Sequence, residues 1–350
     1  MRALIAAFVV SQGDALKTFG NSTGTGWRLT RWRLTRWRLS RWRSTRWLTV
    51  LVGFVAAEAA ASTFILPEPN DGLVGEPVAL KVTYEDRFST LAMKYDLGFE
   101  ELRHANPDVD PWIPGEGARV VLPTQFMLPS GPRDGIVINL PEYRLYYFPK
   151  GKGTVMTFPI GIGRTGFQTP AATTKVVAKI NNPSWYPTKA HRVEHAEMGD
   201  ILPTVVPPGP DNPLGDLAIQ LTLPGYFLHG TNKPFGVGQR VSHGCVRLYP
   251  VDIHSLADAV PIGMQVRIVD APVKVAWHDG ALWMEAHPPL EGEPDMARMT
   301  QIINRAIDGK NVTIDWTRAE EMARTSTGVP GPISIQEPMI QPAQQSAALN

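Results

Sequence analysis

The sequence predicts a mainly β protein, with a small βααβ module before the principal domain and a small α+β appendage after it. The 350-residue chain contains 31 glycines and 32 prolines, which is typical of a fold with many turns. Short runs rich in valine, isoleucine and tyrosine recur between residues 134 and 270, separated by turn residues. Only residues 251–260 show a clear helical pattern within this series. We therefore expect a β-sandwich or barrel-like principal domain.

The first 61 residues are typical of a targeting segment. Residues 27–47 form a basic, tryptophan-rich repeat whose five-residue period fits neither a helix nor a strand. A short apolar run follows at residues 48–62 and contains three alanines at positions 59–61. A basic stretch, a brief apolar run and a small-residue cleavage site together indicate a secretory signal. We expect a periplasmic protein, with an uncleaved N-terminal anchor as the alternative.

The formal net charge of +1 is unevenly distributed along the chain. Residues 1–61 carry ten Lys/Arg and two acidic residues, which leaves the remainder at −7. A mildly acidic body argues against a nucleic acid partner, because phosphate binding needs a basic surface.

A β-α-α-β pattern occupies residues 78–123. A strand-like stretch at 78–84 precedes helical patterns at 89–95 and 98–106, and "PGEGARVVLP" reads as a turn and a closing strand. This order, with its "ANP" landmark, resembles the LysM module. The resemblance implies a glycan-binding domain at residues 77–124, although the family's usual Gly-Asp before the first helix is replaced by "EDR". A spacer domain that binds nothing is the alternative.

The remaining segments are an appendage, a tail and one long connection. Residues 272–328 combine a predicted strand pair with two predicted helices. Residues 329–350 are rich in Pro, Gln, Ser and Ala and are expected to be disordered. The connection 181–214 has no clear periodicity, and loops of that length are typically lids or binding loops.

The only cysteine of the chain lies in "HGTNKPFGVGQRVSHGCVRL". A single cysteine in an oxidising compartment is either inert or kept as a reactive thiol. A catalytic thiol needs a base, and His229 and His243 are available. In an extended strand, His243 and Cys245 would share one face. Backbone N–H groups at Gly244 and Cys245 suit an oxyanion hole, and Arg247 suits a carboxylate.

Three interpretations of this motif compete. Cys245 could be a buried structural residue, a zinc ligand together with His229 and His243, or the nucleophile of an acyl transfer. Packing does not explain why two histidines and several glycines surround one cysteine. The spacing matches no common zinc pattern. The motif therefore favours cysteine acyl-transfer chemistry without a metal or another cofactor.

The motif resembles the signature of the YkuD-type L,D-transpeptidases, in which a histidine precedes Ser-His-Gly-Cys-hydrophobic-Arg. The resemblance extends through "GIVINLPEYRLYYFP", "FPIGIG", "TPAATTKV", "NPSWYPT" and "PPGPDNPLG", and covers residues 134–270. It is strongest to the periplasmic subgroup with an N-terminal LysM-like domain, which includes enzymes that attach an outer-membrane lipoprotein to peptidoglycan.

This resemblance implies roles for individual residues. Cys245 attacks the carbonyl of the third residue of a tetrapeptide stem and expels D-Ala. His229 is the general base, held by the carbonyl of Gly230, while His243 orients the site and Arg247 fixes the motif or binds a carboxylate. Gly230 and Gly244 are counted with the catalytic residues, and Asn232 and Ser242 match supporting positions of the family. Trp185 and Tyr186 lie in the long connection and could line the stem-peptide groove, with core packing as the alternative.

The acceptor stays open at this point. A second stem would give 3–3 cross-links, a lipoprotein lysine would give anchoring, and a free D-amino acid would give exchange. With water as acceptor, the same site would be an L,D-carboxypeptidase. From a different class of function, the chain could be a non-catalytic peptidoglycan-binding protein that uses its LysM-like module.

Overall fold

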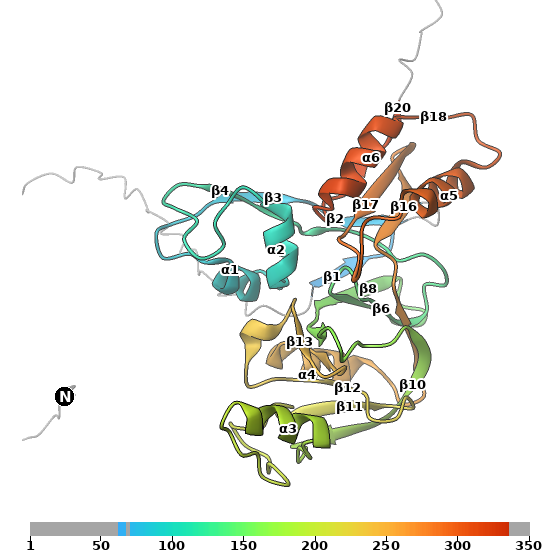
Figure 1. Ribbon diagram of the computed structural model, residues 1–350. Helices are drawn as coiled ribbons and strands as arrows, with labels where there is room; N and C mark the ends of the chain where they lie inside the picture. Colours follow the sequence, from blue (N-terminus) through green and yellow to red (C-terminus); the bar gives the residue numbers. More distant parts are fainter. Residues whose placement is uncertain (1–61, 68–70, 336–350) are drawn as a thin grey trace, which may run out of the picture. The chain divides into compact units, whose positions relative to one another are not determined.

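The computed structural model describes residues 62–67 and 71–335, so the predicted signal region at 1–61 lies outside the described residues. A nine-stranded sheet dominates the fold (Figure 1), as the mainly β prediction requires. Its strands, in spatial order, are β1 (Ser62–Ile65), β8 (Thr154–Pro159), β7 (Arg144–Phe148), β6 (Gly135–Asn139), β15 (Gln265–Val269), β10 (Ala172–Asn181), β11 (Leu217–Leu221), β12 (Phe227–His229) and β14 (Val246–Arg247).

The sheet curls at its longest strand, β10. The first part of β10 pairs with β15 and the second part with β11, and the register shifts between Val176 and Ala178. A bulge of this kind bends and twists a strand, which turns the second half of the sheet away from the first. β14, the last strand of the sheet, then contacts the chain just after β8. Gly161 and Arg247 exchange backbone hydrogen bonds of 2.8 and 2.9 Å there. The curled sheet is therefore barrel-like.

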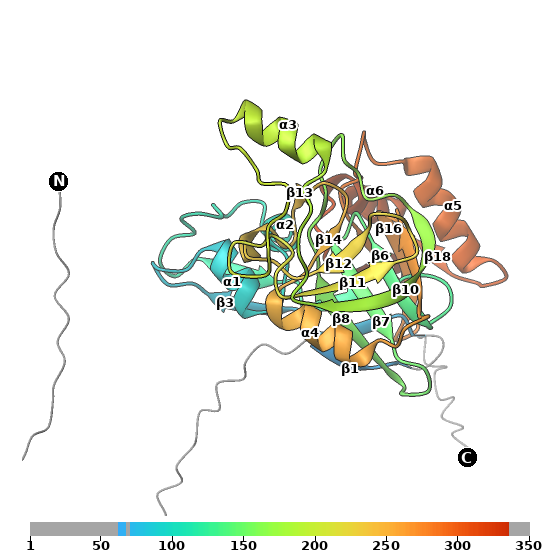
Figure 2. The ribbon, with the colours of Figure 1, turned by 90° about the horizontal axis from the view of Figure 1, so that it is seen from below.

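Two apolar cores lie on opposite faces of β6, β7 and β8. Ile136 and Ile138 face the interior of the curled sheet, together with residues of α4 (Pro250–Ala259; Figure 2). Val137, between them, faces a second core that includes Tyr146 and side chains from residues 74–128. Both faces are covered, which explains why "GIVIN" is apolar at successive positions instead of alternating.

Residues 78–122 form the predicted β-α-α-β order (Figure 1). Asn106, from the "ANP" landmark, ties the end of the second helix to the last strand. Its side-chain amide donates to the carbonyls of Leu102 and Val121, and its Oδ1 accepts from the Val121 N–H at 2.7 Å. The elements of this region are β2 (Leu73–Gly75), β3 (Val78–Lys81), α1 (Phe88–Lys94), α2 (Phe99–Ala105), β4 (Arg119–Leu122) and β5 (Gln125–Met127), with β3 paired to β4 and β2 to β5.

The C-terminal appendage has a core of its own, in which α5 and α6 cover a hairpin (Figure 1). The prediction of disorder for 329–350 is wrong for residues 329–335, because Ile333 is fully buried in this core. Residues 336–350 lie outside the described residues. The elements are β16 (Val273–His278), β17 (Ala281–Ala286), α5 (Met296–Ile307), β18 (Thr313–Ile314), α6 (Trp316–Thr325), β19 (Gly331–Pro332) and β20 (Ser334–Ile335).

The long connection at 181–214 contains a helix that the sequence did not predict, α3 (Lys189–Glu197; Figure 2). None of its residues is buried, so it carries no apolar periodicity. Across the part of the chain that the structure describes, no helix combines the length and apolarity needed to span a membrane.

Candidate active site

Cys245 lies in a tight turn between β13 (Arg240–Ser242) and β14. The Ser242 hydroxyl closes this turn, since it donates to the Cys245 carbonyl at 2.6 Å and accepts from the Gly244 N–H at 3.1 Å. Gly244 has a φ of 107°, which favours glycine. The expectation that His243 and Cys245 share one face of an extended strand is therefore wrong. The Gly244 N–H is also already engaged, so it does not stand free as an oxyanion donor.

Thr169 is a second support of this turn, and sequence reasoning missed it. Its hydroxyl donates to the Gly244 carbonyl at 2.8 Å and accepts from the Gly163 N–H at 2.9 Å. The turn is thus held on both sides by hydroxyl groups.

His229 ends β12, the parallel neighbour of β14, and is paired in register with Arg247. Side chains two residues apart on a strand share a face. Cys245 directly precedes β14, and its Sγ lies 3.5 Å from the Gly225 carbonyl oxygen just before β12. Strand pairing therefore brings the imidazole of His229 and the thiol of Cys245 to the same side of two adjacent chains.

The orientation of the His229 ring is set by its own neighbour. Nδ1 lies 2.5 Å from the Gly230 carbonyl oxygen. A carbonyl oxygen only accepts, so Nδ1 carries the proton of the neutral ring and Nε2 is its unprotonated nitrogen. The backbone of Leu214 is a second hydrogen-bond partner of the ring. Burial, followed by the charge of Arg247, lowers the pKa of His229 to about 4. The imidazole is therefore neutral at neutral pH, the form that a general base requires.

The thiol of Cys245 is half-buried, and burial raises its pKa. A hydrogen bond with the Phe227 backbone and the charge of Arg247 offset part of this effect. The resting pair is therefore a neutral thiol beside a neutral imidazole, and the thiolate must form by proton transfer as substrate reacts.

The backbone of Arg247 is hydrogen-bonded to Gly161, whereas part of its side chain has no hydrogen-bond partner among the described residues. Its Nε is buried and has no hydrogen-bond partner among the residues that the structure describes. Burial also lowers the pKa of the guanidinium. A Cβ at Gly236 would lie 2.5 Å from Nη1, so glycine leaves room for this side chain. The charge of this guanidinium lowers the pKa of both His229 and Cys245.

His243 contacts residues of the long connection. Its ring lies between Phe167 and His191, with centroid distances of 4.3 and 3.7 Å. Its Nε2 lies 2.7 Å from Glu194 Oε2, which also accepts from Arg164 at 2.5 Å. His191 and Glu194 belong to α3. Sequence reasoning missed these four neighbours, and the only available signal was the i, i+3 spacing of His191 and Glu194.

The other expected residues hold or flank the same connection. Asn232 donates from its amide to the Pro210 carbonyl at 3.1 Å. Trp185 forms a backbone bridge with Val206, and its ring lies 5.2 Å from that of His191. Tyr186 is 70% exposed. Asn232 and Trp185 thus contact residues of the long connection, and the Tyr186 ring is exposed to solvent.

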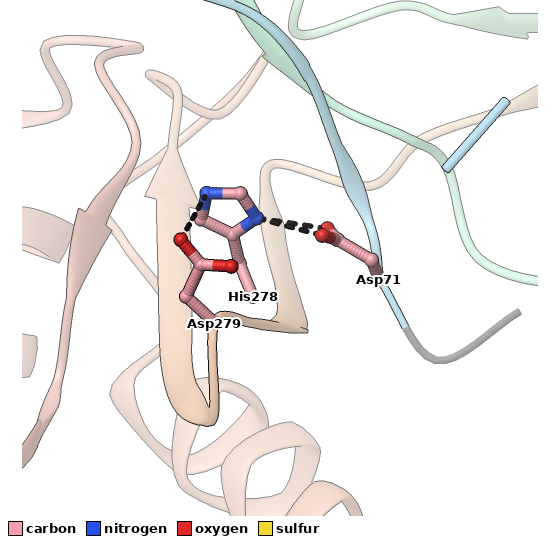
Figure 3. Close-up of side chains that lie close together, drawn as sticks. All are labelled: Asp71, His278 and Asp279. Carbon is pink, nitrogen blue, oxygen red and sulfur yellow. Dashed lines mark hydrogen bonds and ion pairs between the residues drawn. The ribbon is translucent and has the colours of Figure 1, made fainter. Parts of the chain in front are cut away.

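Two histidine–carboxylate groups among the described residues are compact enough to hold an ion, and neither includes Cys245. In one, His278 Nδ1 lies 2.9 Å from both carboxylate oxygens of Asp71 and Nε2 lies 3.8 Å from Asp279 (Figure 3). This ion pair ties the hairpin β16–β17 to the chain before β2. The other group contains Glu142, Glu285 and His287. Lys274 forms ion pairs with both glutamates, at 2.8 and 2.6 Å.

Comparison with known proteins gives one consistent family. The family model described as the L,D-transpeptidase catalytic domain, YkuD, matches residues 133–268. A probable L,D-transpeptidase ErfK/SrfK of Salmonella typhimurium is 41% identical over 290 residues, covering 79% of this chain and 93% of the relative. The probable L,D-transpeptidases YcfS and YbiS of Escherichia coli are 46% and 43% identical, each covering 69% of this chain and 77% and 79% of the relatives. The chain therefore belongs to the YkuD-type L,D-transpeptidases, and it is a cell-wall enzyme that acts on peptidoglycan stems.

Proposed function

We propose that Cys245 is the nucleophile and His229 the general base of this L,D-transpeptidase. The observation that carries the proposal is the Nδ1 hydrogen bond from His229 to the Gly230 carbonyl, which leaves Nε2 unprotonated on the side where strand pairing places Cys245. The roles of the supporting residues follow from their contacts with this pair.

The reaction has two balanced halves. The thiol proton passes to His229 Nε2, while Sγ attacks the carbonyl carbon of the third stem residue. The bond to D-Ala breaks, the imidazolium returns its proton to the leaving amine, and a thioester remains on Cys245. An acceptor amine then attacks the thioester, and His229 takes the proton of that amine. The C–S bond breaks, and the imidazolium passes the proton to the departing thiolate, which regenerates the thiol and the neutral base.

The negative charge on the tetrahedral intermediate needs donors that are already in place. We assign the backbone N–H of Cys245 to this role, because the N–H of Gly244 is engaged by Ser242. We assign Arg247 to a carboxylate of the stem peptide, because its charge lies close enough to His229 and Cys245 to lower the pKa of both. His243 is hydrogen-bonded to Glu194, and we assign it to positioning the turn and not to proton transfer.

The acceptor is proposed to be an amine held in the site. His229 is only 4% exposed, so bulk water has poor access to the base. The test supplies a disaccharide-tetrapeptide alone, with excess tripeptide acceptor, or with a lysine-ended peptide that represents a lipoprotein terminus. Dimers or lysine conjugates that Cys245→Ala does not form support transpeptidation and name the acceptor. Tripeptide as the sole product in all three mixtures would establish the L,D-carboxypeptidase alternative.

We further propose that residues 77–124 form a LysM-like glycan-binding domain, next to a catalytic domain at 134–270 and the appendage at 272–328. Large apolar side chains on the loops of the first domain support this role, since Tyr84, Trp112 and Ile113 are 80, 58 and 71% exposed. Aromatic faces of this kind suit sugar rings. Substituting Tyr84 and Trp112 by Ala should weaken sacculus binding, whereas Trp316→Ala in the appendage should not. Unchanged binding of the double variant would favour a spacer domain.

We propose the periplasm as the location of the enzyme, with residues 1–61 as the export signal. The basic segment and the three alanines at 59–61 support this placement.

A further inference from the structure

A group of buried acids lies where β1 meets the helix that follows the catalytic motif. Asp96 and Asp252 are 5% and 2% exposed, and they are close enough for each to shift the pKa of the other. Asp252 stands in the first turn of α4, a few residues after Arg247. Its Oδ2 is buried and finds no hydrogen-bond partner within the described part of the chain.

The charges of this group do not balance. Arg144 is the cation that faces both aspartates, and its guanidinium already makes two hydrogen bonds of 2.6 and 2.8 Å to Glu101. Three carboxyl groups thus share one guanidinium. Burial and the charge of Asp96 raise the pKa of Asp252 to about 9, so Asp252 is protonated at neutral pH. Burial also raises the pKa of Asp96, while the charge of Arg144 and the hydrogen bonds from Ser62 oppose that shift. Asp96 is therefore the carboxyl group whose ionised form a further cation would stabilise.

The backbone nitrogen of Ser62 lies at the place where such a cation is needed. It is 3.1 Å from Asp96 Oδ2, and the Ser62 hydroxyl is also 3.1 Å from that oxygen. Strand pairing fixes this position, because Ser62 is opposite Thr157 in the β1–β8 ladder. The Thr157 hydroxyl in turn accepts from Arg144 at 3.1 Å. In the sequence, Ser62 directly follows the three alanines at 59–61.

We propose that cleavage between Ala61 and Ser62 creates an α-ammonium group that ion-pairs with Asp96 and so stabilises the mature enzyme. Hydrolysis by a signal-processing endopeptidase consumes one water, leaves a carboxyl group on Ala61 and leaves a primary amine on Ser62, which takes up a proton. An amide gives Asp96 one neutral donor, whereas an ammonium gives three donors and a positive charge. Asp252, the neighbour of Asp96, belongs to α4. The new terminus therefore stabilises the contact between β1 and α4, the helix that follows the catalytic turn.

This inference rests on the proposed export, and its test begins with the whole chain. The full-length precursor is expressed in a bacterium that exports it, and the purified product is analysed by intact mass. We expect a chain that starts at Ser62. A different start, or an unprocessed chain, would overturn the proposal.

The ion pair is then tested by thermal unfolding. The processed chain is compared with a chain that carries one extra glycine before Ser62, each with and without Asp96→Asn. Asparagine tolerates the positive φ of 54° at this position. The Ser62-start chain should melt about 3 °C or more above the extended chain. The difference should disappear with Asp96→Asn and persist with Ser62→Ala, which keeps the amine.

Equal melting temperatures, or a difference that survives Asp96→Asn, would refute the ion pair. Because unfolding does not depend on transpeptidation, an inactive enzyme with an intact melting difference would count against the proposed catalytic roles alone.

Discussion

The ion pair between Arg144 and Glu101 gives the sharpest stability prediction. Arg144 is fully buried, and Glu101→Gln would leave its guanidinium without its bidentate partner. Breaking a buried pair by removing one partner costs about 3–5 kcal/mol. The neighbouring carboxylate of Asp96 offsets part of the charge, so we expect the lower end, about 3 kcal/mol. For a chain of this size, that loss corresponds to a melting temperature lower by about 6–12 °C.

The assay is a double-mutant cycle followed by thermal and urea unfolding. Glu101→Gln, Arg144→Met and the double variant are compared with the parent chain, and the double variant should recover at least half of the loss, because it buries no unpaired charge. The exposed pair of Arg324 and Glu320, 3.2 Å apart, is the matched control. Glu320→Gln should shift the melting temperature by less than about 2 °C. A Glu101→Gln variant that melts as the parent does, or strictly additive losses, would refute the reasoning.

Three further predictions concern the site. Because burial raises the pKa of Cys245, its alkylation rate by iodoacetamide should climb steadily from about pH 6 to 9; a plateau below pH 7 would instead indicate a resting thiolate–imidazolium pair. Ser242→Ala removes the hydroxyl that joins Gly244 N–H to the Cys245 carbonyl, and should lower kcat/KM by about 10–100-fold in steady-state assays with an unchanged circular dichroism spectrum; an undiminished rate would show that the turn holds without it. Glu194→Gln should cost less than about 1 kcal/mol of stability, because the ion pairs of Glu194 with Arg164 and His243 are partly solvated. The same change should lower kcat, because His243 loses its carboxylate partner. Equal kcat values for variant and parent would rule out the positioning role.

Much of the fold could be predicted because its elements bury regular apolar patterns. The helix at Met296–Ile307 has an apolar stripe at helical spacing, and it is one of the two helices predicted within residues 272–328. Helix α3 has no buried residue and therefore no such stripe. The tail was misjudged because the burial of Ile333 depends on partners from β17 and α5, which the local composition does not reveal.

The same distinction applies to the site. The contact of His229 with the Gly230 carbonyl involves adjacent residues, so a motif can imply it. The contact between His243 and Glu194 joins residues 49 positions apart and depends on how the long connection folds back. The strand-face argument for His243 failed because the positive φ of Gly244 interrupts the pleat on which that argument rests.

The central claim is that Cys245 carries the acyl group between donor and acceptor. The most direct measurement is intact-protein mass spectrometry of the processed, reduced enzyme after mixing with purified disaccharide-tetrapeptide, beside Cys245→Ala. The mechanism predicts an adduct on the parent enzyme with the mass of the donor less D-Ala, release of free D-Ala, and neither product with the variant. Folded parent enzyme that forms no adduct and releases no D-Ala, or an adduct that persists in Cys245→Ala, would contradict it.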